Sequence, residues 1–148
     1  MDIAIQAESL TKIYPNQRGL PALRELDLTI PAGILFGLVG PDGAGKTTAL
    51  RILSSVMLPT SGAVHVLGYD TRRQPDPIRQ KIGYMPQNFS LYPDLTVAEN
   101  LNFFADIQQV SPERKRSRIP EMLRFTRLQD FQTRRAAKLS GGMKKKLA

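Results

Sequence analysis

The stretch GPDGAGKTT, Gly40–Thr48, decides which fold this sequence predicts. It matches the pattern G-x-x-x-x-G-K-[ST] at every fixed position. The apolar run ILFGLVG (34–40) before it predicts a central, buried strand, and the residues from Lys46 to about Val56 predict a helix. A strand, a glycine-rich loop and a helix in this order are typical of a site that binds phosphate groups.

Most residues of this loop are suited to binding a polyphosphate. Glycines let the backbone wrap around phosphate oxygens, and the helix N-terminus adds positive potential. We expect Lys46 to neutralise the β- and γ-phosphates, Thr47 to ligate magnesium and Thr48 to donate to the α-phosphate. Asp42 is unfavourable beside a triphosphate unless it points outward at the loop tip. The alternative, a glycine-rich turn without a ligand, is disfavoured by the complete match in this context.

Further strands and helices are predicted around the motif. Strands are predicted where apolar residues alternate or form short runs: DIAIQAESL (2–10), LRELDLTI (23–30), GAVHVLG (62–68) and KIGYMPQ (81–87). Helices are predicted over 96–107, with a capping box of Thr96 and Glu99, and over 111–128, with Ser111 as N-cap. Pro120 lies inside the second helix, where we expect a kink or a break.

Composition limits the class of protein. The chain has 148 residues, of which 41% are hydrophobic, so one domain with a core is possible. It contains no cysteine, no N-terminal signal peptide and no run of roughly 20 apolar residues, which favours a soluble protein of a reducing compartment. The net charge is −1 over residues 1–110 and +9 over residues 111–148. This asymmetry fits a nucleic-acid or membrane surface, a solvated helical face, or a domain whose balancing acids are missing.

Three further features narrow the family. Taken alone, Tyr14 at a strand end indicates packing, and Gln87 after Pro86 indicates a loop residue. However, Tyr14, GPDGAGKTT, Gln87 and LSGGM (139–143), in that order, resemble the nucleotide-binding domain of ABC transporters. The similarity is greatest to ATP-binding subunits of the bacterial drug-exporter type, and it covers essentially the whole chain.

The resemblance implies a role for each matching residue. Tyr14 would stack on adenine, and Gln87 would reach the magnesium and the attacking water. The implied ATP-binding set is Tyr14, Gly40, Pro41, Asp42, Gly43, Ala44, Gly45, Lys46, Thr47 and Thr48, with Thr47 and Gln87 at the magnesium. Leu139, Ser140, Gly141, Gly142 and Met143 would form the signature segment, which closes on the ATP held by a second subunit. Met143 stands where most relatives have glutamine, so one polar contact would be lost.

The resemblance also identifies elements that this sequence does not contain. In the family, an apolar strand ending in Asp-Glu follows the signature helix and supplies the catalytic glutamate, and a later histidine contacts the γ-phosphate. Neither is in this sequence, whose one histidine, His65, lies before Gln87 and is expected to be a half-exposed sheet residue. We therefore expect an incomplete domain that hydrolyses ATP negligibly on its own.

The fold expected from this resemblance is an α/β P-loop fold of ABC type, with an antiparallel β-part and a helical subdomain, incomplete at its C-terminus. Residues 1–87 would form the β-part and P-loop core, 88–138 the helical subdomain, and 139–148 the signature motif with a truncated helix. Candidate apolar contacts with a membrane subunit are Phe89, Leu91 and Tyr92, although core packing fits each equally well.

The expected function is ATP binding and, in the complete protein, ATP hydrolysis that drives export through a membrane permease. The expected partners are that permease and a second nucleotide-binding domain, at the cytoplasmic face of the inner membrane, with no nucleic acid. Two alternatives stay open: a soluble ABC-type ATPase that acts on nucleic acid, and a non-catalytic fragment that binds nucleotide.

Overall fold

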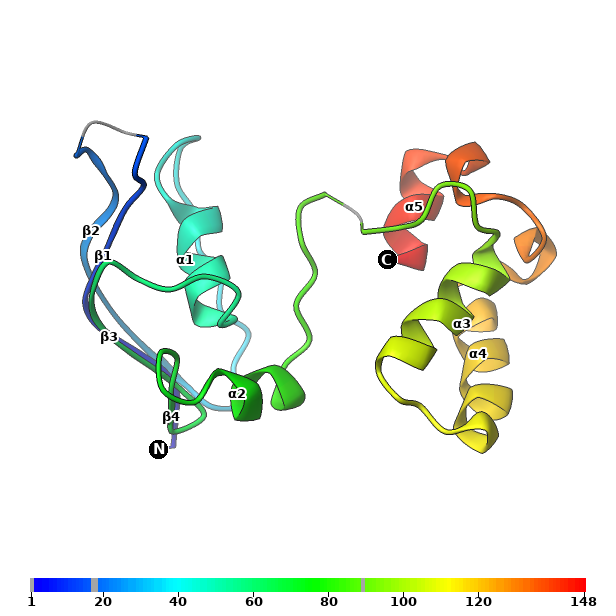
Figure 1. The fold of residues 1–148 in the computed structure, drawn as a ribbon, viewed down its shortest axis with the longest axis horizontal. Helices are drawn as coiled ribbons and strands as arrows, with labels where there is room; N and C mark the ends of the chain where they lie inside the picture. The colour runs from blue at the N-terminus through cyan, green and yellow to red at the C-terminus, as the bar shows by residue number, and fades with distance from the viewer. Residues whose placement is uncertain (1, 17–18, 89) are drawn as a thin grey trace. The chain divides into compact units, whose positions relative to one another are not determined.

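The computed structural model describes residues 2–16, 19–88 and 90–148. They form two compact units, residues 1–84 and 85–148, each of which is described by itself (Figure 1). Within the described ranges, no helix combines the length and the apolar character that crossing a bilayer requires.

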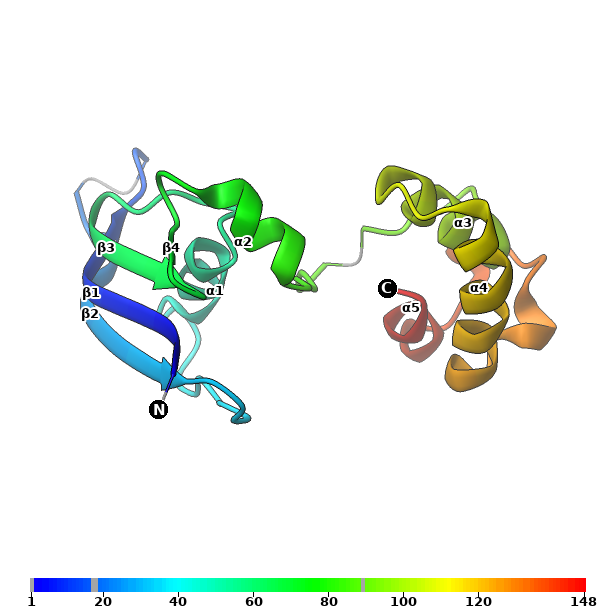
Figure 2. The ribbon, with the colours of Figure 1, turned by 90° about the horizontal axis from the view of Figure 1, so that it is seen from below.

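The first unit is built on an antiparallel sheet (Figure 2). Its strands are β1 (Ile3–Ile13), β2 (Pro21–Pro31), β3 (Ser61–Val66) and β4 (Tyr69–Asp70), in the order β2-β1-β3-β4. β1 is central, since Ala7 pairs with Leu28 of β2 on one side and with Val64 of β3 on the other. The alternating patterns at 2–10, 23–30 and 62–68 therefore predicted strands correctly.

The core of this unit lies between the sheet and α1 (Lys46–Leu53), which follows the glycine-rich loop. Ala49 and Ile52 of α1 are buried against Leu10 and Val64 of the sheet. The helix α2 (Pro75–Lys81) contributes the fully buried Ile78. This packing fixes the start of α1, and with it the loop, against the sheet.

The strand predicted at ILFGLVG is wrong. Residues 34–40 form no strand, and the side chain of Val39 is 90% exposed. A buried strand needs neighbours on both edges, and no strand in the described part of the chain pairs with this segment. The strand predicted at 81–87 is wrong for the same reason: α2 extends to Lys81, and residues 82–86 are irregular.

The second unit is helical. It contains α3 (Val97–Ile107), α4 (Pro112–Thr126) and α5 (Gly141–Leu147), with short 3-10 helices at Gln129–Phe131 and Ala136–Lys138. The predicted capping box is confirmed: Thr96 Oγ1 accepts from the Glu99 N–H at 3.2 Å, and the Glu99 carboxylate accepts from the Thr96 N–H at 2.7 Å. The core consists of Val97, Leu123, Leu128, Ala136, Leu139 and Leu147.

The helix α4 begins after Ser111, whose Oγ accepts from the Arg114 N–H at 3.4 Å, as predicted. It does not break at Pro120. A proline lacks the N–H for one helical hydrogen bond, but its φ suits a helix. Ile119 and Leu123 pack in the core on either side of Pro120, so tertiary contacts hold both turns.

Residues 139–148 share the core of the second unit through Leu139 and Leu147. Along the chain, the boundary between the two compact units falls between residues 84 and 85. The three-part division at residues 87 and 138 stays a prediction.

Candidate functional site

The glycine-rich loop is shaped by glycines in the left-handed region. Gly43 has a φ of 81°, and Gly45, the N-cap of α1, has a φ of 84°. An added Cβ on Gly45 would lie 2.3 Å from the carbonyl oxygen of Ala22 and 2.6 Å from Leu23 Cδ2. Only glycine therefore lets the chain enter α1 so close to β2.

The start of α1 offers unbonded N–H groups. Gly45, the N-cap, has no side chain that could accept a hydrogen bond from these groups. Among the described residues, no group accepts a hydrogen bond from the N–H of Gly45, Lys46 or Thr47. The first N–H groups of a helix need an external acceptor. Because the surrounding loop is exposed, an anion can supply it.

Lys46 folds across this loop. Its Nζ donates to the carbonyl oxygens of Gly40 and Pro41, each at 2.7 Å. The ammonium group is thus held at the loop, where it adds positive charge. Thr47 and Asp42 are exposed. The exposure of Asp42 fits a carboxylate that points away from a bound anion.

The structure brings Tyr14 to the same helix. The Tyr14 hydroxyl lies 3.2 Å from Thr48 Oγ1 and 3.4 Å from Met57 Sδ. Lys12 Nζ lies 5.5 Å from the centroid of the Tyr14 ring and donates to the Leu58 carbonyl at 2.8 Å. The ring is therefore held at its hydroxyl end and along one face. Sequence motifs give no sign of the Tyr14–Thr48 contact, because it depends on how α1 packs on the sheet.

The remaining predicted residues belong to the second unit. Gln87 is exposed, in an irregular segment. Ser140 is the N-cap of α5, and its Oγ accepts from the Met143 N–H at 3.3 Å. Leu139 is buried, and Met143 packs against the core. An added Cβ on Gly141 or Gly142 would meet no described atom within 4 Å, so packing in this unit does not require these glycines.

The three candidate apolar contacts differ. Phe89 lies outside the described residues. Leu91 packs against the core of the second unit. Tyr92 is 46% exposed, and its ring meets that of Phe103 edge-on, with centroids 4.5 Å apart.

Sequence reasoning missed Asn100, which is fully buried beneath this segment. Its Oδ1 accepts from the Tyr92 N–H at 2.9 Å, and its Nδ2 donates to the carbonyls of Tyr92, Leu95 and Thr96. Asn100 thus fixes the chain between Tyr92 and α3. An asparagine within an otherwise apolar helix face was the only signal in the sequence.

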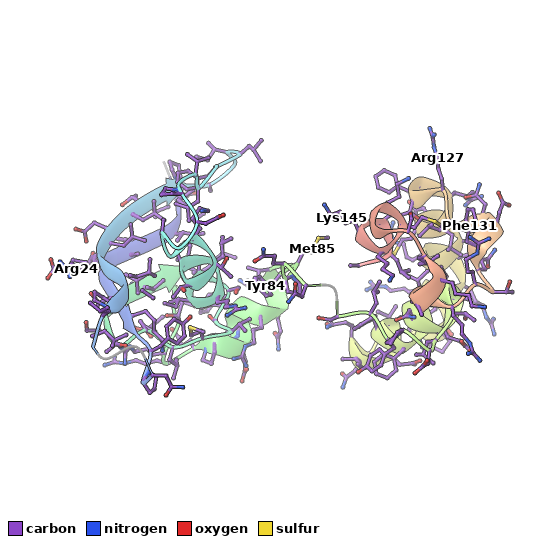
Figure 3. The ribbon with its side chains drawn as sticks, turned by 90° about the horizontal axis from the view of Figure 1, so that it is seen from above. Arg24, Tyr84, Met85, Arg127, Phe131 and Lys145 are labelled. Atoms are coloured by element: carbon purple, nitrogen blue, oxygen red, sulfur yellow. The ribbon has the colours of Figure 1, made fainter. Side chains whose placement is uncertain are left out.

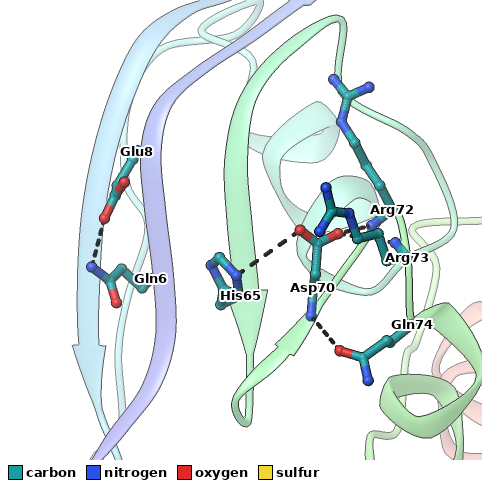
Figure 4. Close-up of polar contacts among 7 residues, drawn as sticks. All are labelled: Gln6, Glu8, His65, Asp70, Arg72, Arg73 and Gln74. Carbon is teal, nitrogen blue, oxygen red and sulfur yellow. Dashed lines mark hydrogen bonds and ion pairs between the residues drawn. The ribbon is translucent and has the colours of Figure 1, made fainter.

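His65 has the place expected for it, on β3 with 47% of its side chain exposed (Figure 4). Its Nε2 lies 3.9 Å from Asp70 Oδ2. Asp70 also accepts from the backbone N–H groups of Arg73 and Arg72, at 2.9 and 2.7 Å. These bonds, that of Arg73 first, lower the pKa of Asp70 below its ordinary value. Asp70 therefore stabilises a turn, and His65 is a neighbour of that turn.

Comparison with known proteins identifies the family. Residues 23–148 match the family model described as ABC transporter. The probable multidrug ABC transporter ATP-binding protein YbhF of Escherichia coli (strain K12) is 47% identical over 146 residues, covering 99% of this chain and 25% of that protein. The daunorubicin/doxorubicin resistance ATP-binding protein DrrA of Streptomyces peucetius is 37% identical, covering 97% of this chain and 43% of that protein.

Solved structures of ABC transporter cassettes are also similar to this chain. The dimeric structure of MJ0796, a bacterial ABC transporter cassette, superposes with a TM-score of 0.82 at 30% identity, covering 97% of this chain and 66% of that one. A post-hydrolysis state of the same cassette, bound to ADP and Pi, also gives 0.82, at 29% identity with the same coverage. The chain spans a quarter of YbhF and less than half of DrrA. Because the family model matches residues 23–148, which are most of this chain, the chain belongs to the ABC transporter family.

Proposed function

We propose that this chain is an ATP-binding part of an ABC exporter, and that it binds ATP with magnesium at the loop Gly40–Thr48. One observation carries the proposal: the unbonded N–H groups at the start of α1 lie in an exposed glycine loop crossed by Lys46. The similarity to YbhF and DrrA, whose names describe multidrug transport and drug resistance, supports export as the task.

Each residue of the first unit then has a role in binding. Lys46 would exchange the carbonyls of Gly40 and Pro41 for the β- and γ-phosphates, which are stronger, charged acceptors. Thr47, exposed at the start of α1, would ligate magnesium together with phosphate oxygens. Adenine would stack on the face of Tyr14 opposite Lys12.

The residues of the second unit would act with other parts of the assembly. Gln87 would contact the magnesium and the attacking water. Ser140, Gly141 and Gly142 would close on the nucleotide of a second cassette, and the open space at both glycines supports close approach of a ligand. The dimeric MJ0796 cassette supports such pairing. The other partner would be a membrane permease, which this chain would contact from the cytoplasmic face of the inner membrane.

Hydrolysis would need more than these residues. Water attack on the γ-phosphate requires a group that positions the water, in addition to charge stabilisation. The sequence contains no apolar run ending in Asp-Glu, and its histidine lies beside Asp70 on the sheet. The chain would therefore bind ATP and hydrolyse it negligibly.

A titration with ATP and magnesium, followed by calorimetry, tests this proposal. Lys46→Ala should weaken binding at least about tenfold, because it removes a charge-assisted contact to phosphate. Arg24→Ala is the matched control: Arg24 is an exposed cation of β2 in the same unit (Figure 3). Equal binding by the wild type and Lys46→Ala would contradict the proposal.

The nucleic-acid alternative has its own test. The net charge of +9 over residues 111–148 favours it, so the chain should be titrated with RNA and DNA at several salt concentrations. Binding through phosphate contacts weakens steeply as salt increases. We expect no such binding, and a steep salt dependence would favour the alternative.

A further inference from the structure

The hydroxyl group of Tyr14 lies between two possible acceptors. Thr48 Oγ1 is 3.2 Å away, and Met57 Sδ is 3.4 Å away. Thr48 is 8% exposed and is the residue of α1 expected to face the α-phosphate. The side chain predicted to hold the base therefore touches a side chain predicted to hold a phosphate.

The number of hydroxyl protons limits how these groups bond. The hydroxyl group of Tyr14 carries one proton, and so does the hydroxyl group of Thr48. If Tyr14 donates to Met57, then the Tyr14–Thr48 bond uses the proton of Thr48, and none is left for a phosphate. If Tyr14 instead donates to Thr48, the Thr48 proton is available. A thioether is a weak acceptor, so the Tyr14 proton leaves Met57 at little cost.

We propose that the Tyr14 hydroxyl is a positioning group for the phosphate site: when nucleotide binds, it donates to Thr48 Oγ1, and Thr48 donates to the α-phosphate. This proposal rests on the proposed function. It adds that Tyr14 acts through its hydroxyl on phosphate binding, in addition to stacking on a base.

The surroundings of Tyr14 support such a chain of hydrogen bonds. Lys12 lies over the ring and is itself fixed to the Leu58 carbonyl. Ala49 and Ile52 anchor α1 in the core. Both hydroxyl-bearing residues are thus held in place, so the bonds need only a change of proton positions. A chain in which one hydroxyl donates to the next strengthens the last donor.

Inorganic tripolyphosphate separates this role from stacking, because it has three phosphates and no base. Its affinity should be measured by calorimetry for the wild-type chain and for Tyr14→Phe, Thr48→Val, the double variant and Thr48→Ser. We expect Tyr14→Phe and Thr48→Val each to weaken binding roughly two- to fivefold. The double variant should bind tripolyphosphate no more weakly than the single variant with the lower affinity, because either substitution alone already breaks the same series of hydrogen bonds. Thr48→Ser, which keeps the hydroxyl, should bind within about twofold of the wild type.

Several outcomes would overturn the proposal. One is unchanged tripolyphosphate affinity in Tyr14→Phe; a lower melting temperature in that variant would then show a structural role only. Another is additive losses in the double variant. If the wild-type chain binds neither tripolyphosphate nor ATP, then the proposed function itself fails, and this inference fails with it. If ATP binds normally and only the Tyr14→Phe result is negative, the proposed function stands.

Discussion

The backbone of Gly45 passes so close to Ala22 that a Cβ on Gly45 would lie 2.3 Å from the Ala22 carbonyl oxygen. This contact fixes the start of α1 against β2. The loop that we propose to bind phosphate is therefore held by the antiparallel sheet.

Gly45→Ala should destabilise the first unit strongly. The substitution adds a clash with backbone to the cost of a positive φ, so we expect a loss of at least about 2 kcal/mol in the free energy of unfolding. Gly43→Ala is the control, since Gly43 has a similar φ of 81° but no described atom within 4 Å of its Cβ position. It should cost about 1 kcal/mol. Urea unfolding measures both, and equal losses would contradict the argument from the clash.

Asn100→Ala should destabilise the second unit. The variant leaves the part-buried N–H and carbonyl of Tyr92 without their side-chain partner, at a cost of about 1–3 kcal/mol. Asn102→Ala provides the comparison on the same helix, because exposed Asn102 makes one hydrogen bond, to the Ala98 carbonyl. It should change stability by less than about 0.5 kcal/mol. The idea fails if the two variants unfold at the same urea concentration.

The stability that the ionised Glu99 side chain gives to the second unit should be lost in acid. The Thr96 backbone N–H, followed by the Thr96 side chain, lowers the pKa of Glu99 below its ordinary value of 4.5. A carboxyl with a lowered pKa stabilises the folded state above its unfolded pKa, and this contribution is lost as pH falls through the folded pKa. Stability should therefore fall below about pH 4.5, and less so in Glu99→Gln. Urea midpoints across this range, compared between the two proteins, measure the difference. An identical acid dependence in both would exclude Glu99 as a source.

Phosphate release from ATP by this chain should be negligible. Gln87 and the loop would supply binding and positioning, but the sequence contains no Asp-Glu strand to act on the attacking water. A sensitive phosphate assay of the wild-type chain and Lys46→Ala should give the same background. Robust turnover that disappears in Lys46→Ala would refute the expectation.

The sequence predicted what is decided locally. The strands at 2–10, 23–30 and 62–68, the capping box at Thr96 and the N-cap Ser111 depend on patterns a few residues long. The prediction of a strand at 34–40 was wrong because an apolar run indicates burial, and burial requires neighbouring strands that pair with the segment, which the described residues do not supply. The Tyr14–Thr48 contact joins residues 34 positions apart, and local patterns give no information about it.

Amide chemical shifts give the most direct test of ATP binding at the loop. In ¹⁵N-labelled chain titrated with ATP and magnesium, the N–H signals of Gly45, Lys46 and Thr47 should shift most, because these unbonded groups would gain phosphate acceptors. In Lys46→Ala, the amide signals of residues 45–47 should shift less at the same, subsaturating ATP concentration. Shifts that leave these three amides unchanged and concentrate instead in the basic residues 111–148 would contradict the account.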